Sequence, residues 1–248
     1  MTGPKPKSVV VMIPTYNEAE NIRPLVEEIL SLPVPGDLRV LVVDDRSPDG
    51  TGEIVLEMAE SEPRVRALIR KKRRGRGSAG IDGFKAALES RPECVIEMDG
   101  DFSHPPRFIP SLLGEIDRRE VVIGSRFVPG GRDSDRSLVR KLITWSVRRF
   151  IRKRFRTDIR DVSSGFRCFR SEVLERLDLD DFISVGPSVV LEVLYKLLLM
   201  NASIVEVPII FVDRRRGTTK LDLPTLVETL LMTLKFPKLY GPRLPARR

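Results

Sequence analysis

The sequence predicts an α/β fold in which helices cover both faces of a mostly parallel central sheet. Through the first half of the chain, short apolar segments rich in Val and Ile alternate with amphipathic helical segments. Polar turn sequences follow several of the apolar segments, at strand ends where sheets of this kind bind ligands. With 248 residues, 41% hydrophobic and 31% charged, the chain can bury a core, which excludes a disordered or fibrous protein.

The first half supplies five strands and four helices in alternation. The expected strands are residues 9–13, 38–43, 65–69, 94–98 and 121–123. The expected helices are residues 18–32, 51–61, 78–89 and 107–117. In the first helix Ile22, Leu25 and Ile29 recur at helical spacing, and Asn17 is placed to cap its start.

The second half is less regular. We expect a strand at residues 204–212 and helices at residues 137–155, 172–177, 188–200 and 223–236. The first and last of these helices are expected to be amphipathic. No internal repeat and no low-complexity linker divides the chain, so we expect residues 1–248 to form a single domain.

The two halves differ in charge. Residues 1–131 carry a balance of −2 and residues 132–248 a balance of +10, within a net charge of +8. A basic half suits a polyanion, a phosphate-bearing ligand or an anionic membrane, although a solvated basic face gives the same pattern. The rival class is a nucleic-acid-binding protein. Since only 6% of the residues are aromatic and no nucleic-acid motif is present, we expect no nucleic-acid partner.

The sequence contains few signals for the cellular compartment of the protein. Cys94 and Cys168 have no metal-type neighbours in the sequence, and both are expected in the core. The apolar runs are much shorter than the roughly 18 residues that a membrane-spanning helix needs. No signal-type apolar segment opens the chain, so we expect a cytoplasmic protein.

Asp99, Gly100 and Asp101 are the strongest local signal. Two carboxylates that flank a glycine just after a buried strand can reach one hard cation, which in turn can hold a diphosphate. The alternative is a plain turn in which Asp99 acts as a cap. His104 lies nearby in a His-Pro-Pro sequence, and as the only histidine of the chain it is interpreted as structural.

Asp44 and Asp45 are the second signal. At a strand end, adjacent aspartates can accept hydrogen bonds from ribose hydroxyls or a nucleobase edge. The alternative is an acidic turn that caps the next helix, because residues 47–50 read Ser-Pro-Asp-Gly, which is strong turn chemistry.

Taken together, these segments resemble the family 2 glycosyltransferases. The matching segments, in order, are IPTYNE (13–18), VVDDRSPDGT (42–51) and MDGDFSHPP (98–106). Further segments resemble the polyprenyl-phosphate mannosyltransferases of that family, the dolichol-phosphate mannose synthase group: GSRF (124–127), GGR (130–132), DVSSGF (161–166), and Arg214 with GTTKL (217–221).

The resemblance implies a GT-A fold, GDP-mannose as the donor, Mg or Mn as the cofactor, and transfer with inversion onto a polyprenyl (dolichyl) phosphate. Residues 1–131 would bind the nucleotide sugar and the metal, and residues 132–248 the acceptor and the membrane. An acceptor phosphate is already anionic and needs no strong base. Such a reaction needs positive charge instead, to bring two phosphates together. A UDP-glucose-dependent polyprenyl-phosphate glucosyltransferase stays open as the alternative.

The resemblance also assigns residues of this sequence to the site. Asp99, Asp101 and Ser103 would hold the metal, and Asp101 and Arg126 would be catalytic. The residues expected around the donor are Pro14, Tyr16, Glu18, Val43, Asp44, Asp45, Asp99, Gly100 and Asp101. The residues expected at the acceptor phosphate are Arg126, Arg132, Arg214 and Lys220.

Three features depart from the family pattern. Ser103 stands where relatives often have the longer Gln, so we expect water to complete the metal shell. Gly75-Arg76-Gly77 stands where relatives commonly have Gly-Leu-Gly. With the basic run 70–74 it either contacts the donor diphosphate or forms a solvated loop, and we favour the loop. Many relatives carry C-terminal membrane helices, which this chain lacks, so membrane contact is expected to be peripheral.

The helix at residues 137–155 is the main candidate for that contact. It combines Leu142, Trp145 and Ile151 with the basic residues Arg148, Arg149, Arg152, Lys153 and Arg154. Together with the apolar segment 223–236, it predicts reversible, salt-sensitive binding to anionic lipid at the cytoplasmic face of a membrane. The alternative is a helix that packs on the core with its arginines in water.

Overall fold

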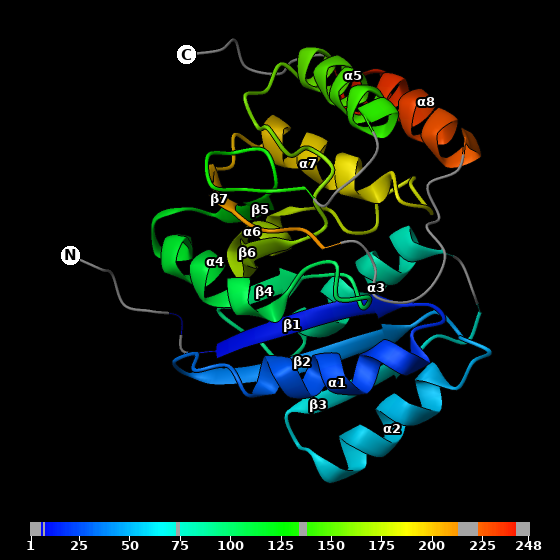
Figure 1. Cartoon of the computed structure of the whole chain (residues 1–248), viewed down its shortest axis with the longest axis vertical. Coiled ribbons are helices and arrows are strands. Elements are labelled where there is room, and N and C mark those ends of the chain that lie inside the picture. The colour runs from blue at the N-terminus through cyan, green and yellow to red at the C-terminus, as the bar shows by residue number, and fades with distance from the viewer. Residues whose placement is uncertain (1–5, 7, 73–74, 134–137, 213–222, 242–248) are drawn as a thin grey trace.

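The computed structural model describes residue 6 and residues 8–72, 75–133, 138–212 and 223–241. Within these residues the centre is a seven-stranded sheet of order β3-β2-β1-β4-β6-β5-β7 (Figure 1). The strands are β1 (Ser8–Thr15), β2 (Asp37–Asp44), β3 (Val65–Ile69), β4 (Cys94–Glu97), β5 (Val121–Ser125), β6 (Arg167–Arg170) and β7 (Ile204–Pro208). Of these described strands only β6 is antiparallel to its neighbours, β4 and β5. The predicted mostly parallel α/β fold is confirmed.

The helices agree with the predicted ones in order and nearly in bounds. They are α1 (Ala19–Leu30), α2 (Thr51–Ser61), α3 (Arg76–Leu88), α4 (Ile109–Glu115), α5 (Leu138–Phe155), α6 (Ser171–Arg176), α7 (Val189–Leu199) and α8 (Leu223–Leu239). The one predicted helix that is divided is 107–117, because 3₁₀ turns at Pro106–Phe108 and Ile116–Arg118 flank α4.

Alternation of side chains along the strands divides the core into two layers. On β1, Val9 and Val11 pack with apolar residues of α1, α2 and α4 on one face of the sheet. Val10 and Met12 point to the other face and belong to a core with α3, α6 and α7. This arrangement places helices on both faces, as the continuous apolar strands predict.

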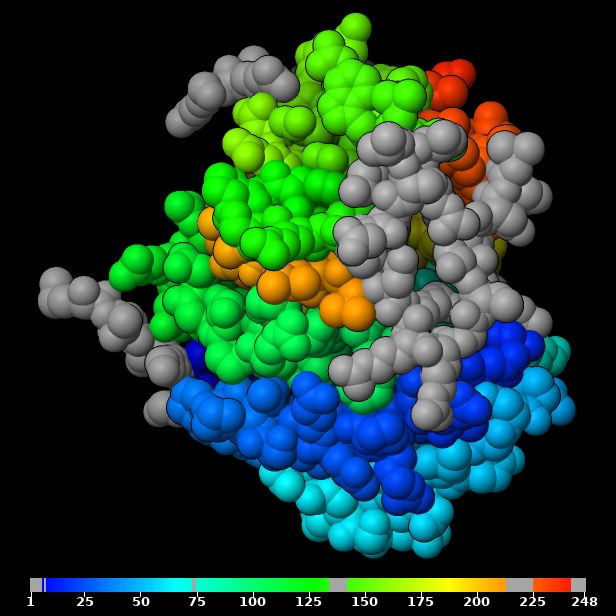
Figure 2. Space-filling model, viewed as in Figure 1, coloured from blue at the N-terminus to red at the C-terminus, as the bar shows by residue number. Residues whose placement is uncertain are grey.

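Helices α5 and α8 form an outer layer beyond α7, at the end of the molecule opposite α2 (Figures 1 and 2). Aromatic rings join the three helices: Tyr195 of α7 lies 4.9 Å from Phe155 of α5 and 6.1 Å from Phe236 of α8, measured between ring centroids. Among the described residues, no helix is both long enough and apolar enough to cross a bilayer.

Strand β6 is the element that the sequence analysis missed. It has only four residues, two of them arginines. Arg167 lies opposite Glu97 in the ladder with β4, is fully buried, and donates hydrogen bonds to the carbonyl oxygens of Val190 (2.8 Å) and Val162 (3.1 Å). A buried, paired arginine removes the apolar pattern by which strands are recognised. Cys168 of β6 and Cys94 of β4 are both buried, as predicted.

Candidate active site

The carboxyl ends of β1, β2 and β4 meet at one edge of the sheet. β1 ends at Thr15, β2 ends at Asp44, and β4 leads into Asp99. Each of the three connections contains a non-glycine residue with positive φ; these are Asn17 (61°), Arg46 (57°) and Phe102 (61°). Such backbone is costly and gathers at functional sites, so this edge is the candidate active site.

Carboxylates tie the loops after β1 and β2 together. Asp44 is 1% exposed and accepts hydrogen bonds from the hydroxyls of Thr15 (3.1 Å) and Ser47 (2.6 Å). Asp49 accepts them from the backbone N–H of Ala19 (3.0 Å) and the hydroxyl of Thr51 (2.6 Å). Burial opposes the charge of Asp49, but these hydrogen bonds hold its pKa below the ordinary value. Asp44 and Asp49 therefore fix the shape of the loops after β1 and β2.

Asp45 forms a buried ion pair that the sequence analysis did not predict. Its Oδ1 lies 2.5 Å from Nη1 of Arg70, with both side chains below 5% exposure, and its Oδ2 accepts the N–H of Gly75 at 2.8 Å. The interpretation of residues 70–74 as a solvated loop is therefore wrong at Arg70. That residue joins the end of β2 to the start of α3, whereas the lysines that follow it are exposed.

The turn Asp99-Gly100-Asp101 lies tightly against β1. A Cβ on Gly100 would be 3.2 Å from Cγ2 of Thr15, so a side chain there would push the turn outward. The N–H of Ser103 donates to Oδ1 of Asp101 at 3.0 Å. Both of these residues are 2% exposed, while the side chain of Asp99 is 32% exposed.

These residues fit a divalent cation that a substrate helps to hold. Among the described residues, no group of three or more His, Cys, Asp or Glu is arranged as a complete metal site. Mg²⁺ in nucleotide sites, however, is bound through one or two carboxylates with substrate phosphates and water. Asp99 and Asp101, with the hydroxyl of Ser103 beside them, match that incomplete donor set.

Arg76 reaches this acidic turn, a contact that the sequence analysis did not predict, since it favoured a solvated loop for the segment Gly75-Arg76-Gly77. Its Nη2 lies 2.8 Å and its Nε 3.2 Å from Oδ1 of Asp99, and its Nη1 lies 3.4 Å from Oε1 of Glu97. Glu97 is 3% exposed, and burial raises its pKa although the two nearby arginines oppose the shift. The one feature of the sequence that could have indicated this contact is the pair of glycines that flanks Arg76.

His104 is structural, as predicted. It is 3% exposed and stacks on Phe166 with 5.3 Å between ring centroids, while the edge of Phe211 lies 5.4 Å away. Its Nδ1 accepts the N–H of Asp99 at 3.4 Å. Burial lowers the pKa of His104 despite the aspartates beside it. The ring supports the turn through its contact with the backbone of Asp99.

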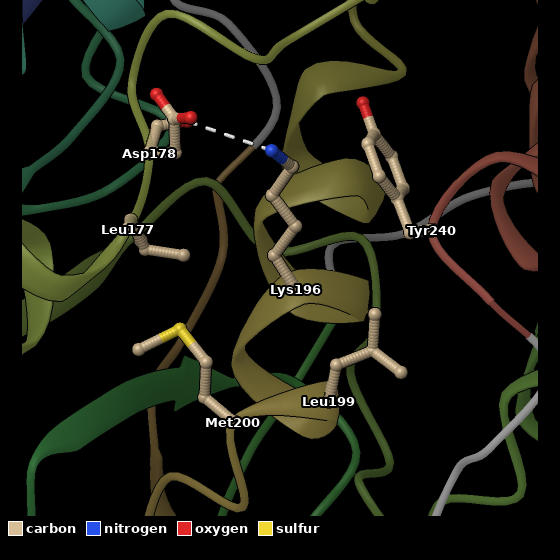
Figure 3. Close-up of a pocket in the computed structure, with 6 residues that line it drawn as sticks. All are labelled: Leu177, Asp178, Lys196, Leu199, Met200 and Tyr240. Atoms are coloured by element: carbon tan, nitrogen blue, oxygen red, sulfur yellow. Dashed lines mark hydrogen bonds between the residues drawn. The ribbon is translucent and has the colours of Figure 1, made fainter.

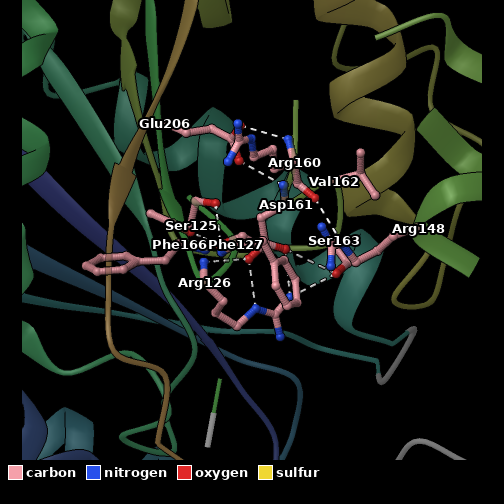
Figure 4. Close-up of polar contacts among 12 residues, drawn as sticks. Ser125, Arg126, Phe127, Arg148, Arg160, Asp161, Val162, Ser163, Phe166 and Glu206 are labelled. Carbon is pink, nitrogen blue, oxygen red and sulfur yellow. Dashed lines mark hydrogen bonds and ion pairs between the residues drawn. The ribbon is translucent and has the colours of Figure 1, made fainter. Parts of the chain in front are cut away.

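Arg126 is held in a fixed orientation by Asp161, which is 0% exposed (Figure 4). Its Nε and Nη2 donate to the two carboxylate oxygens at 2.8 and 2.7 Å, and Nη2 also donates to Ser163 at 2.9 Å. The carboxylate of Glu206 accepts the backbone N–H groups of Arg160 and Asp161, each at 2.7 Å. Burial opposes the charge of Asp161, but Arg126 holds the pKa of Asp161 below its ordinary value.

Arg126 also connects with the acidic turn. Its Cζ lies 5.0 Å from the ring centroid of Phe211, and the Phe211 ring also lies 5.4 Å from that of His104. The next residue, Val212, donates its N–H to the carbonyl of Ser103 at 3.2 Å. The segment after β7 therefore links the acidic turn to Arg126, which makes a continuous site from both halves of the chain.

Arg132 is brought back toward Arg126 by the turn at Gly130 and Gly131. A Cβ on Gly131 would lie 2.5 Å from the carbonyl oxygen of Ser125, so only glycine permits this approach. Arg132 is exposed, and its backbone pairs with Ile210 beyond the end of β7. Arg214 and Lys220, the other residues predicted at the acceptor phosphate, lie outside the described residues.

A family model decides the identity of this fold and site. The model of glycosyl transferase family 2 matches residues 10–178. The chain belongs to this family. The match includes both acidic turns, Arg76, Arg126 and Asp161, and the protein is thus a glycosyltransferase.

Named relatives of this glycosyltransferase cover most of its length. It is 39% identical to the undecaprenyl-phosphate mannosyltransferase of Micrococcus luteus, over 86% of this chain and 87% of the relative. It is 35% identical to the polyprenol monophosphomannose synthase of Mycolicibacterium smegmatis, over 89% of this chain and 83% of the relative. The structure of the mannosyltransferase PcManGT from Pyrobaculum calidifontis, in complex with GDP-Man and Mn²⁺, superposes with a TM-score of 0.63. That match has 20% identity and covers 98% of this chain and 67% of the other, and so supports the GT-A fold.

The remaining residues that the resemblance assigns to the donor surround the same edge of the sheet. Pro14 and Val43 are buried partners in the ladder between β1 and β2. Tyr16 and Glu18 are partly exposed in the loop after β1, where Glu18 accepts a hydrogen bond from the amide of Asn21 at 2.9 Å. These four residues and the two acidic turns are brought together as the resemblance implies.

A separate pocket of about 220 Å³ lies beside α7, and Figure 3 shows its lining residues. The lining includes Leu199 and Met200 at the carboxyl end of α7, before β7 begins at Ile204. Lys196 is held there by the carbonyl oxygen of Asp178 (3.5 Å) and the carboxylate of Asp181 (3.0 Å). This pocket is distant from the carboxyl ends of the strands and does not belong to the candidate site.

Proposed function

We propose that this glycosyltransferase transfers mannose from GDP-mannose to a polyprenyl monophosphate, with Mg²⁺ or Mn²⁺ as the cofactor. One observation carries the proposal: the acidic turn after β4 and the clamped Arg126 lie in one site, connected through Phe211. That site joins carboxylates for a cation to a guanidinium for a phosphate. The names of the relatives support the same acceptor class and sugar.

The donor would lie over the loops after β1 and β2. Tyr16 and Glu18 are partly exposed there, and Asp44 and Asp45 stabilise the loops through buried contacts. Asp99, Asp101 and Ser103 would hold the cation beside Gly100. When bound, the cation supplies positive charge to the diphosphate that leaves with the nucleotide.

The acceptor phosphate would bind at Arg126, with Arg132, Arg214 and Lys220 as further cations. Two nitrogens of Arg126 are engaged by Asp161, so its guanidinium is oriented before a substrate arrives and loses little entropy on binding. A phosphate oxygen attacks without help from a strong base, because it is already charged at neutral pH. His104 is buried, and its Nδ1 accepts the N–H of Asp99, so no base role is assigned to it.

Transfer assays with a panel of GDP- and UDP-sugars, with and without a polyprenyl phosphate, test the proposal. We expect GDP-mannose to be the preferred donor and the product to require the lipid phosphate. Preference for UDP-glucose would instead identify a polyprenyl-phosphate glucosyltransferase. Transfer to a lipid-free acceptor at an equal rate would contradict the assignment of the basic half to a polyprenyl phosphate.

The outer layer of α5 and α8 is the proposed site of peripheral contact with an anionic membrane at its cytoplasmic face. Large apolar side chains are exposed on both helices: Leu142, Ile143, Trp145 and Phe150 on α5, and Val227, Leu231, Leu234 and Leu239 on α8. Arg149, Lys153, Lys235 and Lys238 are exposed on the same two helices. Apolar burial together with attraction of basic side chains to anionic lipid favours reversible binding.

Two residues predicted at that surface face the protein instead. Ile151 is 1% exposed and belongs to the core. The guanidinium of Arg148 lies 3.4 Å from the ring centroid of Phe127 and donates to the carbonyl of Arg160 at 3.0 Å. They are spaced three residues apart on α5, which places them on the inner face of the helix.

Flotation with anionic vesicles tests the membrane contact. We expect the protein to float with the vesicles at low ionic strength and to be released by salt, because Debye screening weakens the attraction. Leu231→Glu on α8 should reduce binding about tenfold or more, because it removes apolar burial and adds a repelled charge. Leu56→Glu is the matched control, since Leu56 is 49% exposed but lies on α2 at the other end of the molecule. Equal loss in both variants, or no flotation of the wild type, would exclude this surface.

A further inference from the structure

Arg76 occupies a place that three glycines shape. A Cβ on Gly75 would lie 2.7 Å from the carbonyl oxygen of Val185, and one on Gly77 would lie 2.6 Å from that of Ser184. The N–H of Gly77 donates to the carbonyl of Val185 at 2.9 Å, and Gly75 has a φ of +100°. These contacts fix the backbone of residues 75–77 against the loop before α7. In this conformation the side chain of Arg76 points toward Asp99.

The third glycine lies on the far side of the guanidinium. A Cβ on Gly165 would be 2.7 Å from Nη2 of Arg76 and 3.6 Å from Oδ2 of Asp99. The Arg76–Asp99 pair thus rests directly on the backbone between Asp161 and β6. A side chain at position 165 would displace the guanidinium, so the backbone at Gly165 forms one wall of the place that the pair occupies.

The pair also leaves Arg76 incompletely satisfied. Both of its hydrogen bonds go to one oxygen, Oδ1 of Asp99. Its Nη1 is buried without a hydrogen bond, 3.4 Å from Oε1 of Glu97. A buried donor without an acceptor costs free energy, and a further anionic oxygen at this place would be favourable for it.

We propose that Arg76 is a positioning residue that competes with the divalent cation for Asp99 until the donor diphosphate binds. This inference rests on the proposed assignment of Asp99 and Asp101 to a cation. In the nucleotide-free protein, the guanidinium neutralises the carboxylate that the cation needs and repels the cation. The anionic diphosphate offers Arg76 another partner, so the cation and the donor bind cooperatively, each raising the affinity for the other.

Binding of Mn²⁺ to the nucleotide-free protein, followed by electron paramagnetic resonance, tests the competition without measuring activity. Arg76→Leu should bind Mn²⁺ about tenfold or more tightly than the wild type, because a unit positive charge beside the cation is removed. With saturating GDP the gain should shrink, since the competition is already relieved in the wild type. A merely structural role of Arg76 would not tighten Mn²⁺ binding.

Three further variants make the result decisive. Arg76→Gln removes the charge but keeps a polar group near Glu97, so it should tighten Mn²⁺ binding even if the leucine variant folds poorly. Arg76→Lys keeps the charge, and its affinity for Mn²⁺ should stay near that of the wild type. Arg66→Leu is the control for net charge, because Arg66 pairs with Glu89 at a half-exposed site on β3. Unchanged or weaker Mn²⁺ binding in both neutral Arg76 variants overturns the proposal.

Asp101→Asn separates this inference from the function on which it rests. If the Asn variant loses Mn²⁺ binding while the neutral Arg76 variants match the wild type, the cation site stands and the competition is wrong. If the Asn variant binds Mn²⁺ like the wild type, the assignment of the cation site fails, and the competition fails with it.

Discussion

Asp101→Asn is expected to reduce mannosyl transfer about 100-fold or more at saturating substrates. The side chain is 2% exposed, and its Oδ1 accepts the N–H of Ser103. An asparagine oxygen can accept the same hydrogen bond, so the turn should keep its shape while one negative charge is lost from the proposed cation site. The measurement is the initial rate over a series of Mg²⁺ and Mn²⁺ concentrations.

The control for Asp101 is Asp117→Asn, which removes a carboxylate just before β5, at the opposite edge of the sheet. This variant should keep the wild-type rate. The thermal midpoint of both variants should stay within a few degrees of the wild type, since neither substitution opens a cavity. Wild-type activity of the Asp101 variant at every metal concentration would show that the cation site is wrongly assigned.

The strands that lead into the proposed donor site were predictable because they are largely buried on both faces. β1, β2 and β4 read as largely apolar runs that end in polar turns, so their order along the chain and their carboxyl ends follow from the sequence. The two acidic turns lie at those ends, which is why local motifs located most of the candidate site.

Contacts over long sequence distances were not predictable in the same way. Arg70 and Asp45 are 25 positions apart, and Arg126 and Asp161 are 35 apart. A basic run such as residues 70–74 is usually solvated, and nothing local marks the one arginine that becomes buried. β6 was missed for the same reason, because Arg167 finds its partners on other elements of the fold.

Asp161→Asn is the second substitution with a large expected effect, and it acts on the proposed acceptor site. The Asp161 side chain is 0% exposed and that of Arg126 is 9% exposed, so the variant leaves a buried guanidinium without its counter-ion. Loss of one partner of such a pair costs about 3–5 kcal/mol of unfolding free energy. Use of the polyprenyl phosphate should fall strongly in the surviving folded protein, because Arg126 loses its fixed orientation, while binding of GDP-mannose without acceptor stays near the wild-type value.

The comparison for Asp161 is Asp180→Asn, which breaks the exposed pair with Lys85 and should cost below about 1 kcal/mol. The pH dependence separates the charge of Asp161 from its packing. Its folded pKa lies below the ordinary value of 3.8, so the contribution of the ion pair is fully present above that pH and is lost only as the pH falls through the folded pKa. Denaturant unfolding of the wild type and of the Asp161 variant should therefore differ by the same amount at pH 7 and pH 5, and the difference should shrink in stronger acid. A variant as stable as the wild type at pH 7, with unchanged use of the lipid phosphate, would show that Asp161 does not hold Arg126 for the acceptor.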